Sequence, residues 1–179
     1  TLVNVATTDT TIELSWTGVE GATKYVVSNG SDIQNTDSDS IVFNSLSPDT
    51  VYNFTVTSYN GDIIEGGQSS ISGITTGPAV VTNFTSGAIT NTSVELTWTG
   101  SSNATKYVVT RTGGITQNTE DTSIIFSGLS AYTGYYFSVT SYLGDNIKGG
   151  KTNGLYKTTA PAAPTNLSAS FTEWTSNKV

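Results

Sequence analysis

The chain is dominated by an internal repeat. Thr11–Gly18 (TIELSWTG) returns as Ser93–Gly100 (SVELTWTG), and Ser58–Gly67 (SYNGDIIEGG) returns as Ser141–Gly150 (SYLGDNIKGG). The copies are offset by 82 or 83 residues, which is the size of an autonomous domain with its own core. A repeat of this length sets the domain organisation before any other feature is considered. We therefore expect two domains and a fragment.

The fragment is the beginning of a third copy. Pro164–Ser170 (PTNLSAS) echoes Val81–Gly87 (VTNFTSG), and the copy stops before an equivalent of Trp98. The expected boundaries are 1–77 for the first repeat, 78–160 for the second and 161–179 for a C-terminal tail, with a short linker at Gly77–Val81 between the repeats.

Apolar and polar residues alternate within each repeat. Ile12, Leu14 and Trp16 fall on one face of an extended chain, with Glu13 and Ser15 on the other. This period of two indicates half-buried antiparallel strands, and no ten-residue stretch has helical periodicity. The sequence therefore predicts an all-β fold.

One predicted turn differs between the copies. Asn60-Gly61 favours the left-handed dihedrals of a tight hairpin. The second copy has Leu143-Gly144 at this position, so we expect a different turn there.

Three motifs resemble the fibronectin type III family. The first is L-x-W, the second is Y-x-V and the third is L-x-P-x-T-x-Y-x-F-x-V. They are found at Leu14–Trp16 and Leu96–Trp98, at Tyr25–Val27 and Tyr107–Val109, and, for the third, in full at Leu46–Val56. The resemblance covers both repeats and the start of the third. It implies two tandem immunoglobulin-like β-sandwiches with a C-terminal extended strand.

The resemblance also assigns core residues. They are Trp16, Trp98, Tyr25, Tyr107, Tyr52 and Tyr135. Tyr52 and Tyr135 are the corner tyrosines, whose hydroxyls are expected to bond backbone a few residues upstream. The second copy keeps Leu129, Phe137 and Val139 but has Ala131 and Tyr132 near the Pro-x-Thr positions. We therefore expect a weaker corner there.

The chain has little material for catalysis. It contains no His and no Cys, and its hydroxyls have no evident base beside them. Lys24 and Lys106 are expected in solvent, which disfavours a Schiff-base or isopeptide role. The acidic groups Asp37-Ser38-Asp39 and Glu120-Asp121 match no calcium-loop spacing. We expect no enzyme activity, no metal and no cofactor.

Charge and hydropathy restrict the partners. The net charge of −7 and the pI of about 4.2 argue against nucleic acid and anionic membranes, which need basic patches. No apolar run approaches the roughly 18 residues of a membrane helix. Abundant Thr, Ser, Asn and Gly are typical of secreted and surface proteins. We expect an extracellular or cell-surface chain, processed or cut from something longer, because no signal peptide is visible and residue 1 is Thr.

Six N-x-S/T sequons are present, at Asn29, Asn53, Asn83, Asn91, Asn103 and Asn166. Composition alone gives about four by chance, so their placement is more informative. Asn53 lies between two inward residues, Asn91 and Asn103 fall in predicted turns, and Asn83 and Asn166 occupy the same position of the repeat. We expect N-linked glycans at several of them, with O-linked glycans as a further option.

The tail has three competing interpretations. It is a flexible stub of a cut array, the first strand of a further domain, or a strand donated to the first domain of another copy. Donation would build a head-to-tail filament. The apolar residues available for such a strand are Leu167, Ala169, Phe171, Trp174 and Val179.

Energetics limit the donation hypothesis. Burying three large side chains contributes roughly 5–8 kcal/mol, whereas ordering the backbone costs about 1–2 kcal/mol per residue. Donation therefore needs a real vacancy. Thr1 aligns with Asn83, so the first repeat lacks the lead-in that Pro78–Thr82 gives the second.

These observations favour a non-catalytic structural module, a glycosylated spacer or fibre subunit that binds other copies of itself. One alternative is an adhesin or receptor segment, which predicts an exposed patch on the loops. Another is an accessory domain of a secreted polysaccharide-degrading enzyme, which predicts a catalytic domain elsewhere in a longer chain.

Overall fold

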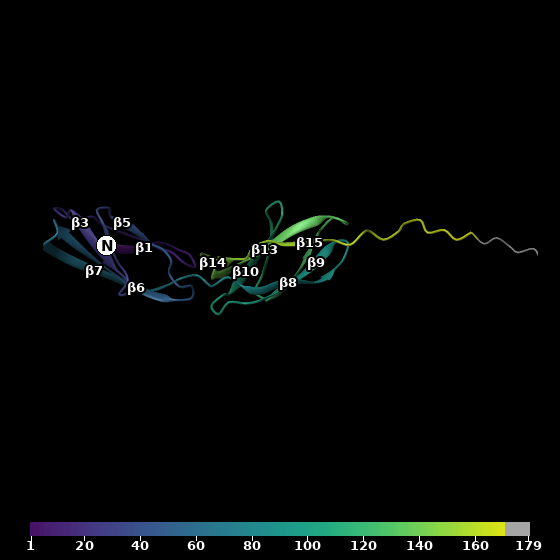
Figure 1. The fold of residues 1–179 in the computed structure, drawn as a ribbon, viewed down its shortest axis with the longest axis horizontal. Coiled ribbons are helices and arrows are strands. Elements are labelled where there is room, and N and C mark those ends of the chain that lie inside the picture. Colours follow the sequence, from purple (N-terminus) through teal and green to yellow (C-terminus); the bar gives the residue numbers. More distant parts are fainter. Residues whose placement is uncertain (171–179) are drawn as a thin grey trace, which may run out of the picture.

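The computed structural model describes residues 1–170, which form two β-sandwiches placed end to end and a tail that continues along the long axis (Figure 1). Residues 1–170 contain strands and loops and no helix. The all-β sandwich prediction is confirmed.

The first sandwich pairs a three-stranded sheet, in the order β1-β2-β5, with a four-stranded sheet, in the order β4-β3-β6-β7. All pairs are antiparallel. Its strands are β1 (Leu2–Thr7), β2 (Ile12–Trp16), β3 (Lys24–Ser28), β4 (Ile33–Thr36), β5 (Ser40–Phe43), β6 (Val51–Asn60) and β7 (Ile64–Thr75). The alternating pattern explains the inward faces: Ile12 and Leu14 of β2 are fully buried, while Glu13 between them is not.

The second sandwich repeats this arrangement with sheets β8-β9-β12 and β11-β10-β13-β14. Its last strand is interrupted, so β14 and β15 both pair with β13. The strands are β8 (Thr82–Ile89), β9 (Ser93–Thr99), β10 (Lys106–Arg111), β11 (Ile115–Thr119), β12 (Ser123–Ser127), β13 (Gly134–Leu143), β14 (Ile147–Lys151) and β15 (Leu155–Thr158).

Each sandwich has its own core cluster. Tyr25, Tyr107, Trp98 and Tyr135 are buried, with exposed fractions of 3–8%. Trp16 and Tyr52 are only half-buried and pack against the first core from its edge. The equivalent core residues are therefore buried to different depths in the two repeats.

Both tyrosine corners are intact. The Tyr52 hydroxyl accepts a hydrogen bond from Ser47 N at 2.9 Å, and Tyr135 accepts one from Ser130 N at 3.0 Å. The expectation of a weaker second corner was wrong. Thr133 supplies the corner threonine there: its hydroxyl donates to Ala131 O at 2.9 Å, as Thr50 donates to Pro48 O at 2.8 Å.

The expectation of different hairpin turns was also wrong. Gly61 and Gly144 have φ values of 64° and 61°, a left-handed conformation that glycine adopts without steric cost. Asn60 and Leu143 end strands β6 and β13. The preceding residue therefore lies in the strand, where its identity does not alter the turn.

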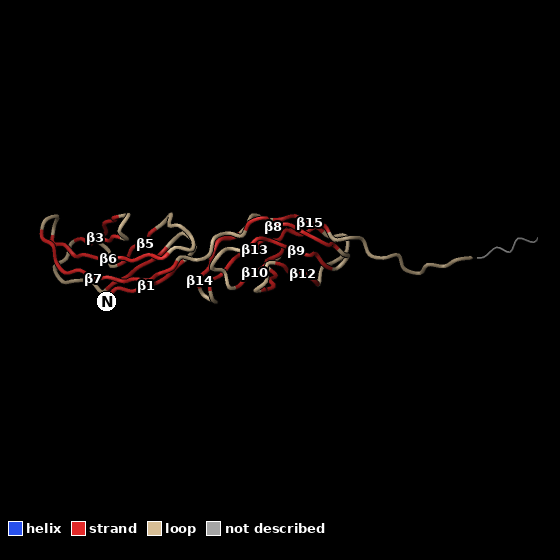
Figure 2. The backbone as a smooth tube through the Cα atoms, turned by 90° about the horizontal axis from the view of Figure 1, so that it is seen from below, coloured by secondary structure: helices blue, strands red, loops and turns tan. Residues whose placement is uncertain are grey.

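The described part of the tail, residues 161–170, forms no strand and is exposed throughout (Figure 2). Leu167 is 96% exposed, and Ala169 is exposed as well. Residues 161–170 therefore do not form the predicted extended strand, which needs a backbone partner. The candidates Phe171, Trp174 and Val179 lie outside the described residues.

Candidate functional site

The chain leaves both sandwiches at equivalent points. A buried threonine marks each exit: Thr76 donates to Ser47 O at 2.8 Å, and Thr159 donates to Ser130 O at 2.6 Å. The next residue is fixed in the same way in each repeat, since Gly77 N bonds Thr8 O and Ala160 N bonds Thr90 O. The linker and the tail therefore start from the same place on their respective sandwiches.

After its exit, the linker crosses a glycine pair of β14. Gly150 N donates to Pro78 O at 2.8 Å, and the Ser141 hydroxyl donates to Ala79 O at 2.9 Å. A Cβ at Gly149 would overlap Pro78 O, and one at Gly150 would overlap the backbone of Val80. We call Ser141, Gly149 and Gly150 the second-repeat cradle. The linker can enter it only because the two β14 positions are glycines.

The linker then enters the second core. Val81 is 4% exposed and belongs to the cluster that contains Trp98, Tyr107 and Val139. Burying a valine side chain contributes about 1.5–3 kcal/mol. The segment between the repeats is therefore part of the second sandwich rather than a loose tether.

Asp49 of the first repeat completes the joint. Its amide donates to Gly77 O at 3.1 Å. Its carboxylate oxygen Oδ2 accepts bonds from Ala79 N at 3.3 Å and from the Ser102 hydroxyl at 3.1 Å. Gly77 lies against β14, because a Cβ there would be 2.5 Å from Lys148 O. Backbone and side-chain contacts thus hold the two repeats together.

The first repeat has the same cradle, and no linker-like segment of residues 1–170 enters it. Ser58, Gly66 and Gly67 are the counterparts of the second-repeat cradle, and we call them the first-repeat cradle. Ser58 is 5% exposed, whereas both glycines are exposed. Among the residues that the structure describes, none comes within 4 Å of where a Gly67 Cβ would lie.

Two hollows flank the first-repeat cradle. A cavity of about 40 Å³ includes Trp16, Tyr25 and Val56 in its lining, and these are the counterparts of residues that cluster with Val81. A second hollow, of about 200 Å³, is lined by Glu20, Ser58 and Gly66 among others. Within residues 1–170, these hollows lie where the linker lies in the second repeat.

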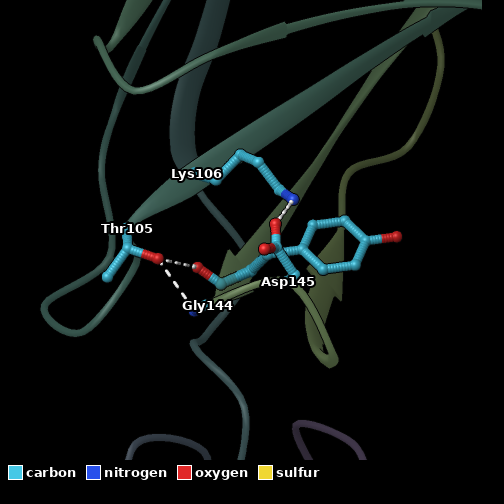
Figure 3. Close-up of polar contacts among 5 residues, drawn as sticks. Thr105, Lys106, Gly144 and Asp145 are labelled. Atoms are coloured by element: carbon cyan, nitrogen blue, oxygen red, sulfur yellow. Dashed lines mark hydrogen bonds and ion pairs between the residues drawn. The ribbon is translucent and has the colours of Figure 1, made fainter.

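A polar clasp holds each hairpin that carries a cradle. Lys106 Nζ lies 2.5 Å from Asp145 Oδ1 and 5.5 Å from the ring centre of Tyr142. Thr105 Oγ1 accepts a bond from Gly144 N at 2.8 Å, so two adjacent residues of the chain grip one turn (Figure 3).

The first repeat has the same clasp. Lys24 pairs with Asp62 at 2.5 Å and lies over Tyr59, while Gly61 N bonds Thr23. The hydrogen bond from each lysine, with its positive charge, lowers the pKa of Asp62 and Asp145 below 3.8. The sequence search missed the aspartate partners, although the shared S-Y-x-G-D of both copies marked them. The clasp is structural, since each lysine is already paired with a carboxylate.

The acidic groups form no cation site in the described chain. Asp37, Asp39, Glu120 and Asp121 are all exposed. Within residues 1–170, no group of three His, Cys, Asp or Glu side chains could hold a metal ion.

The sequon asparagines are accessible to different degrees. Asn53, Asn83, Asn103 and Asn166 are exposed, while Asn29 and Asn91 are half-buried. Asn53 accepts a bond from Gly73 N through Oδ1 at 2.9 Å, which leaves free the amide nitrogen to which a glycan is attached. Asn29 likewise uses only Oδ1, to accept from Ser31 N and Asp32 N.

The second repeat carries an exposed tyrosine pair that the sequence reading missed. The rings of Tyr136 and Tyr156 are 4.8 Å apart and 58% and 54% exposed. Tyr136 also lines a groove of about 410 Å³ with Arg111 and Lys151. Its counterpart in the first repeat is the sequon residue Asn53.

Comparison with known proteins gives a family match for one segment of the chain and a fold for both repeats. Residues 79–153 match the model of the fibronectin type III domain. The chain is similar to the crystal structure of the chicken CNTN1 FN1–FN3 domains, at 12% identity and a TM-score of 0.50, over 89% of this chain and 66% of that one. A two-domain fibronectin type III segment from chicken tenascin aligns at 19% identity and a TM-score of 0.42, over 89% of this chain and 97% of that one. The search of curated proteins found no match.

Domains of this family are generally non-catalytic structural or binding modules, common in extracellular and cell-surface proteins. No helix within residues 1–170 is long and apolar enough to span a membrane. Residues 79–153 therefore match the fibronectin type III domain, and the first repeat shares the strand order and tyrosine corner of this segment.

Proposed function

We propose that this chain is an extracellular structural module, a glycosylated spacer or fibre subunit that assembles head-to-tail with other copies through its C-terminal segment. The repeats lie end to end, and the tail leaves from the end opposite the first repeat (Figure 1). Copies joined in this way would extend along one axis.

One observation supports head-to-tail assembly above the others. The tail leaves the second sandwich through the same anchor as the linker leaves the first, at Thr159-Ala160 and Thr76-Gly77. Beyond the anchor the tail repeats the linker's features, and Asn166 has a φ of 58° where Asn83 has 52°. The tail thus begins with the geometry and sequence of a joint between repeats.

Electron microscopy and sedimentation of the purified chain test the assembly. We expect concentration-dependent linear particles that disappear when residues 161–179 are deleted. Filaments that persist after this deletion would rule out assembly through the tail.

Glycosylation is tested separately, on material from the native source. Its intact mass should fall on treatment with a glycosidase that cleaves N-linked glycans. A native mass equal to that of the bare polypeptide would rule out the glycans and leave the assembly proposal untouched.

One observation favours a second candidate function, a binding module. The exposed pair Tyr136–Tyr156 beside Arg111 offers flat aromatic faces and a cation next to a groove, an arrangement suited to planar or sugar ligands. The patch lies on strands β13 and β15, not on the loops where the sequence placed it. Binding to a glycan array that Tyr136→Ala abolishes would support this role, and an array without signal would end it.

A further inference from the structure

An asparagine followed by glycine can modify itself, and the chain contains this pair three times, at Asn29-Gly30, Asn60-Gly61 and Asn153-Gly154. In this reaction the backbone nitrogen of the glycine attacks the side-chain carbonyl carbon of the asparagine. Glycine favours the attack because it has no Cβ to hinder the approach and its backbone rearranges readily. The step also needs a segment that can open locally and a glycine N–H without a partner. The surroundings of each pair therefore decide whether it reacts.

The Asn60-Gly61 pair is held at the turn of the first hairpin. Gly61 N donates to Thr23 Oγ1 at 2.8 Å. Asn60 pairs with Ile64 in the ladder between β6 and β7, and the ion pair of the clasp fixes the same turn. Both the attacking nitrogen and the asparagine backbone are therefore restrained.

The Asn29-Gly30 pair is held by a local turn. Asn29 Oδ1 accepts bonds from Ser31 N at 3.0 Å and from Asp32 N at 2.7 Å. Gly30 N donates to Ser28 Oγ at 3.0 Å. Both reacting groups are engaged, so the attack would have to break three hydrogen bonds.

The Asn153-Gly154 pair has no such restraint. It lies in the break between β14 and β15, and both of its residues are exposed. Within residues 1–170, neither the Asn153 side chain nor Gly154 N takes part in a hydrogen bond. The counterpart in the first repeat, Ser70-Ile71, lies inside the continuous strand β7 and is paired with β6. The interrupted strand is thus the feature that frees this pair.

We propose that Asn153 is a self-modifying site that converts to aspartate and isoaspartate, while hydrogen bonds protect Asn29 and Asn60. Gly154 N forms a bond to Asn153 Cγ, and the bond between Cγ and Nδ2 breaks. Ammonia leaves with the proton of Gly154 N, and a five-membered succinimide ring remains. Water then opens the ring at either carbonyl, which gives aspartate or an isoaspartate whose backbone runs through the former side chain. This inference is independent of head-to-tail assembly.

The conversion would alter the groove beside the exposed tyrosine pair. Asn153 lines this groove together with Arg111, Tyr136 and Lys151, so its new carboxylate would face a site that contains two cations. A Cβ at Gly154 would be 3.3 Å from Tyr136 Cδ1, so the extra backbone methylene of isoaspartate would arise next to this ring. The change therefore affects the exposed surface of the second repeat and not its core.

Peptide mapping of the full chain, incubated folded in mildly alkaline buffer, tests the proposal. Trypsin cuts after Lys151 and Lys157, so residues 152–157 form one peptide that contains Asn153. Conversion replaces an NH2 group by OH and adds about 1 Da. Asn153 should convert at least about tenfold faster than Asn29 or Asn60. Equal rates at the three sites, or a faster reaction at either of the others, would overturn the inference.

Incubation in denaturant separates structure from local sequence. Once the chain is unfolded, the three rates should agree within about threefold, because the turns and the ladder no longer protect Asn29 and Asn60. If Asn153 keeps a tenfold lead in denaturant, its reactivity comes from the neighbouring residues and the structural inference is wrong.

A matched pair of variants tests the protection directly. Thr23→Val removes the acceptor of Gly61 N and should speed the conversion of Asn60 at least about threefold. Thr105→Val removes the equivalent bond in the second repeat, where Leu143 replaces the asparagine, and should leave the rate at Asn153 unchanged. Melting curves confirm that both variants are folded during the incubation. An unchanged rate at Asn60 in folded Thr23→Val would overturn the protection that the inference assigns to this bond.

Discussion

The two repeats share strand order, corner and clasp, yet they differ at the end where the chain enters. In the second repeat, Val81 is buried and Trp98 is 6% exposed. In the first repeat, a small cavity lies beside the half-buried Trp16. The same sequence motif thus places its tryptophan at different depths in the two copies.

The burial of Val81 shows that the second core is not closed by its own strands alone. The residues that seal the second core come from the linker, and the first repeat positions that linker through Asp49. Burial of the core tryptophan therefore depends on what precedes the repeat as well as on the repeat itself.

The largest expected effect comes from the two core tryptophans. Trp98→Ala should destabilise the second repeat by about 3–5 kcal/mol, the cost of emptying a filled core site. Trp16→Ala should destabilise the first repeat clearly less, because its site is half open. Urea unfolding, monitored through separate NMR resonances of each repeat, measures both losses of stability. Equal losses would show that the two cores are equally closed.

The next largest effect on stability is expected at the glycines of the two cradles. Gly150→Ala should cost about 1–3 kcal/mol, because the new Cβ overlaps the backbone of Val80. Gly67→Ala should stay within about 0.5 kcal/mol, as expected for an exposed position without contacts. Thermal melting of both variants measures the difference. A destabilised Gly67→Ala would mean that the first cradle is not open.

The tyrosine corners should give equal effects in both repeats. Tyr52→Phe and Tyr135→Phe each remove the acceptor for one backbone amide, Ser47 N or Ser130 N, at a cost of about 1–2 kcal/mol. Denaturant midpoints of the two repeats measure these costs. A clearly smaller loss for Tyr135→Phe would restore the weaker corner that the sequence suggested.

The smallest effect belongs to the clasps. The folded pKa values of Asp62 and Asp145 are lowered from 3.8 by the hydrogen bonds from their lysines. The ion pairs therefore contribute their full stability above pH 3.8 and lose it as the pH falls through the lowered pKa values. Both side chains are exposed, so salt should weaken the pairs too. When the stability of the Asp62→Asn and Asp145→Asn variants is measured as a function of pH, this loss at acid pH should be missing. An unchanged acid profile would show that the pairs contribute nothing.

Much of this architecture was predictable from local patterns. Alternation at Ile12–Trp16 defined strands, and the L-x-P-x-T-x-Y motif defined the corner, because both depend on residues close in sequence. The aligned copies also gave the register that places Asn166 with Asn83.

The features that sequence reading missed depend on contacts across the fold. The partner of Lys106 is 39 residues away, and the pairing of Tyr136 with Tyr156 depends on the register of β13 and β15. The different depths of Trp16 and Trp98 could not be read from their shared motif either, since Trp98 packs in a cluster with Val81, which lies outside the strands.

The buried threonines at the two exits have a mechanical consequence. A chain pulled from its ends passes its load from each sandwich to the next segment at Thr76 and Thr159. Each hydroxyl is tied to a carbonyl of the tyrosine corner, Ser47 O or Ser130 O. Tension is thereby transferred to the tyrosine corner, and the joint beyond, held by few hydrogen bonds, should yield first and act as a reversible extension element.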